Sequence, residues 1–284
     1  MKHFYLIANP RKEGTREVAE RIVAYLKERG ATCAGCAEQG QLAEPGHGYT
    51  DVAGIPPETD CVITLGGDGT LIQAARDLVA LQLPLAGINM GNLGYLTQVS
   101  KGEAIEPMLD ALLEDNYTLE RRMMLEGRVI GPSREVKGIA LNEIVLTRRD
   151  VLQVLRFEVY VNGVYLNEYM ADGMIVATPT GSTAYNLSAG GPLVAPGAEL
   201  IVMTPICSHS VNSRSIILSP DDRISLRLAC SEDKQQTAVF DGDQVVNMTC
   251  EDTLEISRAA NYTTLIQLQN VSFLETLRNK LDRI

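Results

Sequence analysis

Residues 61–70, CVITLGGDGT, constrain the possible fold of this chain more than any other stretch. The first half is short, apolar and rich in β-branched side chains, which is typical of a buried parallel strand. Gly66, Gly67 and Gly69 allow the backbone to turn tightly and to approach a ligand closely. A helix capped by Thr70 is predicted to follow. The amide N–H groups at its N-terminus would form a ready site for a phosphate.

One acidic residue, Asp68, lies in the middle of this turn. A carboxylate at a phosphate-binding turn would repel the bound phosphate, so its presence there is unexpected unless it holds a metal ion or accepts a proton. The alternative is that Asp68 only caps the helix in an ordinary strand-to-helix turn. Asp68 is therefore a candidate catalytic or metal-binding residue.

The chain of 284 residues is long enough for two domains, and 45% hydrophobic with 21% charged residues is the composition of a soluble globular protein. The net charge of −11 argues against binding to nucleic acid or to anionic membranes. A polyphosphate ligand would need local help from amides, metal ions or particular Arg and Lys side chains. No charged-then-apolar leader precedes the first predicted strand, so a cytoplasmic location is expected.

The six cysteines include one Cys-x-x-Cys pattern, Cys33 to Cys36. A redox or zinc site would need a helix directly after this pattern or a second pair of ligands, and neither is evident. Reduced, mostly buried thiols are expected.

Strands and helices are predicted to alternate over residues 1–117, as in a doubly wound, Rossmann-like α/β domain. A second glycine-rich turn, residues 89–95, follows a later strand. Turns at the carboxyl ends of neighbouring strands face one crevice in such a sheet, so both turns are expected to share a ligand. The predicted elements are a strand at 3–9, a helix at 13–29 ended by Gly30, a strand at 31–36, an exposed loop at 41–59, a strand at 84–89, and a helix from a Ser100/Glu103 capping box to about 115.

Residues 118–270 are predicted to form a β-rich, sandwich-like domain of short strands, with a hairpin at Asn162-Gly163. A terminal amphipathic helix after a Ser272/Glu275 capping box is expected to return to the N-terminal domain, which would comprise residues 1–117 and 271–284. The predicted strands lie at 123–130, 136–147, 152–161, 167–178, 215–218, 224–229 and 254–257.

The segment 178–192, TPTGSTAYNLSAGGP, contains a second candidate site. Ser182 or Thr183 can cap a short helix near 183–189, which Gly190 and Gly191 would end. Such a helix would present free N–H groups, hydroxyls and the Tyr185 ring at one point. The alternative is a polar connection between strands.

Other motifs are weaker or missing. Asn142-Glu143 precedes an apolar strand and could bind a sugar diol or an adenine edge, although an exposed strand start explains it equally. Asp172-Gly173 and Asp241-Gly242 are ordinary turn dipeptides when taken alone. The sequence contains neither a P-loop, nor G-x-G-x-x-G, nor G-x-S-x-G, which argues against the common nucleotide-binding and serine hydrolase classes.

Taken together, GGDGT at 66–70, Asn142-Glu143, the 178–192 segment and the Asp-Gly at 241 resemble the bacterial NAD kinases, in order and in spacing. The resemblance covers most of the chain. It implies ATP-dependent phosphorylation of the adenosine 2′-hydroxyl of NAD to give NADP, in a cleft between two domains. It also implies a homodimer or homotetramer that uses a divalent metal ion, with Mg²⁺ expected, and no nucleic-acid or membrane partner.

The resemblance places Asp68 as the proton acceptor and as a dinucleotide contact, and it places Gly69 beside the bound dinucleotide. No metal ligands are assigned. Relatives often carry a basic residue near the positions of Gln153 and Met170 in this chain. This difference concerns how the protein binds the pyrophosphate of the dinucleotide. The further implied dinucleotide contacts are Asn142, Glu143, Asp172, Thr183, Ala184, Tyr185, Asn186, Leu187, Ser188 and Gln244.

Two other functions stay open at this point. Diacylglycerol-type lipid kinases are similar in the opening Asn-Pro and the glycine-Asp-glycine turn, but the charge of −11 and the lack of a basic amphipathic helix disfavour a membrane substrate. A dinucleotide sensor without catalysis would have no need of Asp68 as a base.

Overall fold

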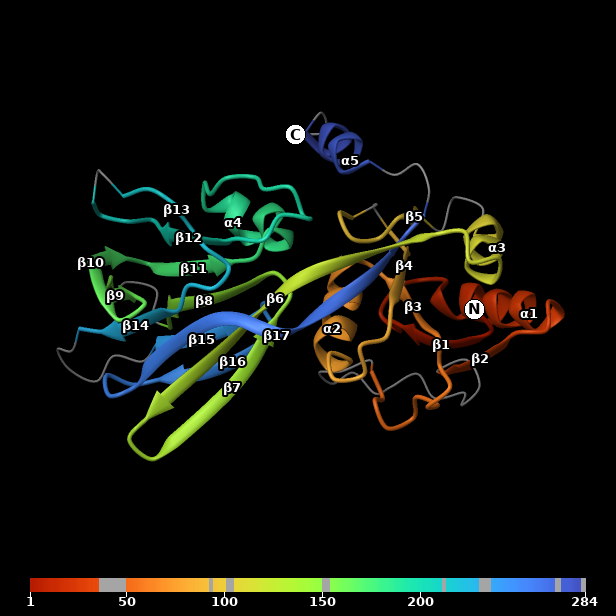
Figure 1. Ribbon diagram of the computed structural model, residues 1–284, viewed down its shortest axis with the longest axis horizontal. Coiled ribbons are helices and arrows are strands. Elements are labelled where there is room, and N and C mark those ends of the chain that lie inside the picture. Colours follow the sequence, from red (N-terminus) through yellow and green to blue (C-terminus); the bar gives the residue numbers. More distant parts are fainter. Residues whose placement is uncertain are drawn as a thin grey trace. The chain divides into compact units, whose positions relative to one another are not determined.

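The computed structural model (Figure 1) describes residues 1–35, 50–91, 94–100, 105–149, 154–210, 213–229, 236–268 and 272–281. The chain divides into two compact units. Unit 1 comprises Met1–Arg121 and Thr263–Ile284, and unit 2 comprises Arg122–Tyr262. No helix of the described residues is long and apolar enough to cross a membrane.

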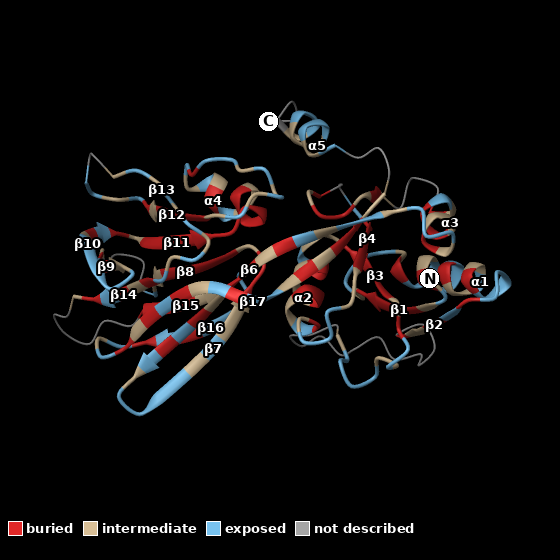
Figure 2. Ribbon diagram, viewed as in Figure 1, coloured by how far each residue is buried: buried red, intermediate tan, exposed pale blue. Residues whose placement is uncertain are grey.

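Unit 1 is built on a parallel sheet in the order β2-β1-β3-β4, with Leu265 of β17 beside Leu85 of β4. The central strands are buried on both faces, as their continuous apolar sequences predict (Figure 2). The strands are β1 His3–Ala8, β2 Thr32–Gly35, β3 Cys61–Gly66, β4 Leu85–Asn89 and the short β5 Val99–Ser100, which pairs with β4.

Helices cover both faces of this sheet, which confirms the predicted doubly wound α/β fold. On one face, Ile22 of α1 (Thr15–Glu28) and Leu109 of α3 (Glu106–Leu113) join the core with alternate residues of β1, β3 and β4. On the other face, α2 (Asp68–Asp77) packs against β3 and β4, and its Leu71 side chain lies over Gly87. This arrangement leaves the carboxyl ends of β1, β3 and β4 at one edge of the sheet.

Two helix starts differ from the sequence prediction. Helix α2 begins at Asp68 rather than after Thr70, and its N-cap residue Gly67 is extended. Helix α3 begins at Glu106 with a proline in its first turn, whereas Ser100 belongs to β5 and makes no cap. Glu103 lies outside the described residues. Gly30 adopts φ +76° and ends α1 as predicted.

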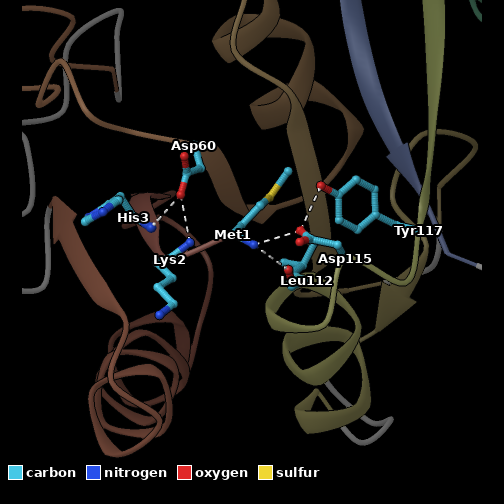
Figure 3. Close-up of polar contacts among 7 residues, drawn as sticks. All are labelled: Met1, Lys2, His3, Asp60, Leu112, Asp115 and Tyr117. Atoms are coloured by element: carbon cyan, nitrogen blue, oxygen red, sulfur yellow. Dashed lines mark hydrogen bonds and ion pairs between the residues drawn. The ribbon is translucent and has the colours of Figure 1, made fainter.

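The amino end of the sheet is fixed by two carboxylates (Figure 3). Asp60 accepts hydrogen bonds from the N–H groups of Lys2 (2.7 Å) and His3 (2.9 Å), which ties β1 to the start of β3. Asp115 accepts one from the Met1 amine at 2.7 Å. Both contacts lie at the edge opposite the glycine turns, so they support the sheet without entering the candidate site.

Unit 2 is a sandwich of two antiparallel sheets, as predicted. Alternate residues of both sheets form one core that includes Leu125, Ile144, Phe157, Val176 and Phe240. The first sheet runs β13 Ile216–Leu218, β12 Ile201–Ile206, β11 Gly173–Ala177, β8 Glu143–Arg148, β15 Gln236–Phe240 and β16 Gln244–Met248. The second includes β10 Val164–Ala171, β9 Leu155–Val161, β14 Ile224–Leu228 and β17 Thr253–Gln267, with the ribbon of β6 Thr118–Gly131 and β7 Arg134–Ala140.

The strand boundaries in unit 2 correct several predictions. The predicted strand 136–147 is two strands, β7 and β8, because the chain bends at residues 141–142. The predicted strand 167–178 is likewise divided into β10 and β11 at Asp172. Strands β12, β15 and β16 were not predicted. The hairpin at Asn162-Gly163 is confirmed, since both residues have positive φ.

Helix α5, Phe273–Leu281, begins directly after Ser272 and is grouped with unit 1. Its Lys280 ammonium lies 4.7 Å from the centre of the Tyr95 ring. The expected apolar face is less buried than predicted, because Leu274 is 70% exposed.

Candidate functional site

The carboxylate of Asp68 is held from the loop that follows β4. Oδ2 accepts a hydrogen bond from the Tyr95 N–H at 2.7 Å. Oδ1 accepts hydrogen bonds from the N–H of Leu96 (3.2 Å) and from the N–H (3.2 Å) and hydroxyl (3.1 Å) of Thr97. Four donors therefore fix the orientation of one partly buried carboxylate at the N-terminus of α2.

The two glycine turns are packed against each other through this side chain. A Cβ atom on Gly94 would lie 1.8 Å from Oδ1 of Asp68, so only glycine fits there. Asn89, at the end of β4, donates to the Thr97 hydroxyl at 2.9 Å and accepts from the Gly91 N–H at 2.7 Å. The proximity of the two turns is thus confirmed, whereas a shared ligand stays a prediction.

The first glycine turn has one packed side and one open side. A Cβ on Gly66 would lie 2.1 Å from Oγ1 of Thr70, which accepts a hydrogen bond from Asn9. Gly69 is exposed, and a Cβ there would meet nothing within 4 Å. The Thr70 side chain therefore packs against Gly66 on one side of the turn. On the other side, the backbone at Gly69 is accessible to a ligand.

In unit 2, the chain bends into β8 at residues 141–143, here called the β8 corner. The carboxylate of Asp241 accepts hydrogen bonds from all three of its amides: Oδ2 from the Leu141 N–H (2.7 Å), and Oδ1 from those of Asn142 (2.8 Å) and Glu143 (3.1 Å). Residue 241 was not among the predicted site residues. Its signal is the Asp-Gly pair in the three-residue hairpin loop 241–243, where Asp241 and Gly242 both have positive φ.

Glu143 is an unusual side chain for this position because it is only 7% exposed. Its Oε2 atom has no hydrogen-bond partner among the described residues. Burial, with the nearby charge of Asp241, raises the pKa of Glu143 to about 8. The carboxyl group therefore keeps its proton at neutral pH and can both donate and accept a hydrogen bond.

The 178–192 segment is built directly onto the β8 corner. The Thr178 hydroxyl donates to the Leu141 carbonyl (2.6 Å) and accepts from the Gly181 N–H (3.1 Å). A Cβ on Gly181 would lie 2.1 Å from the Asn142 carbonyl oxygen, so the segment and the corner touch there. A 3₁₀ turn, η1 (Thr180–Thr183), and one helical turn, α4 (Tyr185–Ser188), follow.

The predicted caps of this segment differ from the observed ones. The Ser182 hydroxyl bonds to the backbone of Val194 instead, donating to its carbonyl (3.2 Å) and accepting from its N–H (3.0 Å). The Thr183 hydroxyl donates back to the Thr180 carbonyl. Gly190 has φ +82° and ends the helical turn as predicted. Tyr185 and Ser188 are exposed, whereas Thr183, Ala184 and Leu187 are partly buried.

Asn186 is fully buried, and its amide is occupied within the protein. Nδ2 donates to the carbonyls of Ser182 (3.3 Å) and Pro192 (3.0 Å), and Oδ1 accepts from the Thr204 hydroxyl (2.7 Å). These bonds make Asn186 a support of the segment, and its contact with the dinucleotide stays a prediction.

Two other predicted residues are not brought to the β8 corner. In the sheet, Ala177 pairs with Glu143 but Gly173 pairs with Thr147, so Asp172 lies at the far end of β11. Its carboxylate forms an ion pair with Arg148 at 2.9 Å. Gln244 projects to the opposite face of the sheet, where its amide donates to the Lys137 carbonyl at 3.2 Å.

The residues that could hold a metal ion are sparse. Among the described residues, no group of three or more His, Cys, Asp or Glu side chains has suitable geometry. Cys33 and Cys61 are buried free thiols, while Cys36 and Gln153 lie outside the described residues. Met170 is 46% exposed.

Comparison with known proteins identifies the family. The family model described as ATP-NAD kinase N-terminal domain matches residues 51–117, and that of the ATP-NAD kinase C-terminal domain matches residues 141–268. The NAD kinase of Lachnospira eligens is 41% identical to this chain over an alignment of 294 positions. The alignment covers 99% of this chain and 100% of the relative.

Two solved structures share the fold. The yeast NADH kinase complexed with NADH has a TM-score of 0.83 at 24% identity, covering 98% of this chain and 86% of that one. An NAD kinase from Archaeoglobus fulgidus in complex with ATP has a TM-score of 0.76 at 24% identity and covers 100% of both chains. Because the two family models match more than half of the chain and the Lachnospira relative spans 99% of it, the chain belongs to the NAD kinase family.

Proposed function

We propose that the protein transfers the γ-phosphoryl group of ATP to the 2′-hydroxyl of the adenosine ribose of NAD and so produces NADP. Family membership supports the reaction. The single structural observation that carries it is the Asp68 carboxylate, which is oriented by four hydrogen bonds beside the open backbone of Gly69.

Asp68 acts in this proposal as the proton acceptor. A ribose hydroxyl is a weak nucleophile, and a positioned carboxylate can take its proton as the new phosphorus–oxygen bond forms. Among the described residues, Oδ2 accepts a hydrogen bond only from Tyr95, so it keeps a lone pair for the hydroxyl proton. Orientation by backbone amides holds this lone pair in place before the substrate binds.

The β8 corner and the 178–192 segment would bind the dinucleotide. The proton-bearing carboxyl group of Glu143 and the amide of Asn142 offer donors and acceptors to a sugar diol or an adenine edge. Thr183, Ala184, Tyr185, Leu187 and Ser188 supply further backbone and side-chain surface, and Asn186 supports them. Asp172 and Gln244 stay proposed contacts for other parts of the ligand, because neither reaches this corner.

Phosphate binding must overcome a net charge of −11. The extended residue Gly67 and the N-terminus of α2 present amides that favour anions. Mg-ATP is the expected substrate, and its metal ion would neutralise charge on the transferred phosphoryl group. A cytoplasmic location, a homodimer or homotetramer, and the absence of nucleic-acid and membrane partners stay predictions.

The test is to mix the protein with NAD and Mg-ATP and to measure NADP with an NADP-specific dehydrogenase. NADP formed in equal amount to ADP is expected. A lipid kinase would instead phosphorylate diacylglycerol in vesicles, and a sensor would bind NAD in calorimetry without making NADP. Either result would overturn the proposal.

A further inference from the structure

Asp241 is about 100 residues away from the β8 corner in sequence, but it binds the corner through hydrogen bonds. It lies in the turn between β15 and β16, with φ +49°, followed by Gly242 with φ +73°. Its side chain accepts the three amides of residues 141–143, and its own N–H donates to the Glu143 carbonyl at 3.0 Å. Four hydrogen bonds thus connect one turn residue to three consecutive residues of the candidate binding site.

Among the described residues, Thr178 binds carbonyl groups of this corner, those of Leu141 and Asn142, whereas the amides of the corner are bound by Asp241. Residues 141–142 connect strands of two different sheets, and their amides point away from either ladder toward the Asp241 carboxylate. Converging amides form an anion-binding concavity, which a carboxylate fills well. Without this carboxylate, three amides at a partly buried bend would lose their partner.

The same contact places a negative charge beside the buried Glu143 carboxyl group. Burial, and to a smaller extent Asp241, raises the pKa of Glu143 and so disfavours its ionised form. From another element, Tyr185 of α4 lies near this position: burial, and then the nearby Cys207, Asp172 and Glu143, raise the pKa of its phenol. Asp243 lies in the same turn as Asp241.

We propose that Asp241 is a positioning residue for the dinucleotide: its carboxylate fixes the β8 corner and places a negative charge beside the buried Glu143 carboxyl group that meets the ligand. The inference rests on the proposed function of the corner in binding NAD. A neutral carboxyl group suits this ligand, because it donates a hydrogen bond without adding negative charge near a pyrophosphate.

The test compares Asp241→Asn with the parent in NAD binding by calorimetry from pH 6 to pH 9. Asparagine keeps the size and one acceptor oxygen but removes the charge, so Glu143 should ionise about one pH unit lower. The ratio of the NAD dissociation constants, variant to parent, is then expected to rise about tenfold between pH 6 and pH 9. If the substitution only disturbs the conformation of the β8 corner, the ratio of the dissociation constants will not change with pH. That result would overturn the proposal.

Two further variants keep the inference falsifiable if Asp241→Asn folds poorly. Glu143→Gln imitates the protonated side chain, so its NAD affinity should stay constant up to pH 9 while that of the parent falls above about pH 8. An affinity that falls equally in both would contradict the proposal. Asp222→Asn is the matched control, since Asp222 also accepts a turn amide, from Ser219 at 2.8 Å, and should give a ratio near one at every pH.

This experiment also separates the inference from the proposed function. NADP formation by the parent protein tests the function, whereas the pH dependence of NAD affinity tests the role of Asp241. A parent protein that binds NAD with the expected pH dependence but makes no NADP would retain the inference and reject the kinase activity.

Discussion

Two carboxylates of this protein are held in opposite ways. Asp68 receives four hydrogen bonds and is partly exposed, whereas Oε2 of the buried Glu143 receives none from the described residues. Environments that differ in this way assign different roles to the same chemical group. An oriented carboxylate suits proton acceptance, and a neutral buried carboxyl group suits hydrogen bonding to a ligand.

Gly94→Ala should displace the Asp68 carboxylate without removing it. The new Cβ would overlap with all three carboxyl atoms, at 1.8 to 2.2 Å, so the short side chain must rotate away. Because misplacement of a catalytic group by about 1 Å can cost about a hundredfold, we expect kcat to fall by about that factor. Steady-state kinetics with NAD and ATP measures it. A kcat within threefold of the parent would show that the observed position of Asp68 is not needed.

Glu143→Gln should stabilise the protein in neutral and alkaline solution. Folded Glu143 keeps its proton up to about pH 8, whereas an unfolded carboxyl loses it near pH 4.5. The folded state therefore binds more protons between these values, and the free energy of unfolding falls as pH rises through the window. Glutamine removes this loss, so the variant should have the higher Tm at pH 8. Thermal unfolding of both proteins at pH 5 and pH 8 measures this difference. An equal fall in Tm from pH 5 to pH 8 in the variant and in the parent would contradict the raised pKa of Glu143.

Local patterns predicted most elements but not the breaks between them. The central strands of unit 1, helix α1 and the Asn162-Gly163 hairpin follow from apolar runs and glycine positions. The bend at residues 141–142 could not be predicted, because the carboxylate that stabilises it comes from residue 241. Likewise, Ser182 looks like a cap in sequence but bonds to Val194 across the segment. Long-range side-chain contacts, rather than propensity, shape both candidate binding segments of unit 2.

Helix α4 is a single turn and depends on its supports. Asn186→Ala would remove three hydrogen bonds and leave buried carbonyls and the Thr204 hydroxyl without this partner. At about 0.5–1.5 kcal/mol for each bond, the free energy of unfolding of unit 2 should fall by about 2–4 kcal/mol. The KM for NAD should rise more than that for ATP. Urea unfolding and kinetics measure both, and a KM effect confined to ATP would reassign the segment.

For the molecule as a whole, acid should destabilise both units. Burial acts to raise the pKa of Asp60 and of Asp252, but hydrogen bonds from Lys2 and His3 to the first, and from Arg134 and Thr249 to the second, lower both values. A depressed pKa contributes stability above the unfolded value of about 4, and that stability is lost as pH falls through the folded value. Tm should therefore fall steeply below about pH 4. A Tm that is equal at pH 5 and pH 3 would contradict this.

The central claim is that Asp68 accepts the proton of the 2′-hydroxyl during phosphoryl transfer. Asp68→Asn keeps the size and much of the hydrogen bonding but removes the charge and the basic oxygen. We expect this variant to bind NAD within a few-fold of the parent in calorimetry and to form NADP at least about a hundredfold more slowly in the dehydrogenase-coupled assay. NADP formation within a few-fold of the parent rate would contradict the claim and leave Asp68 as a residue that only fastens the two glycine turns together.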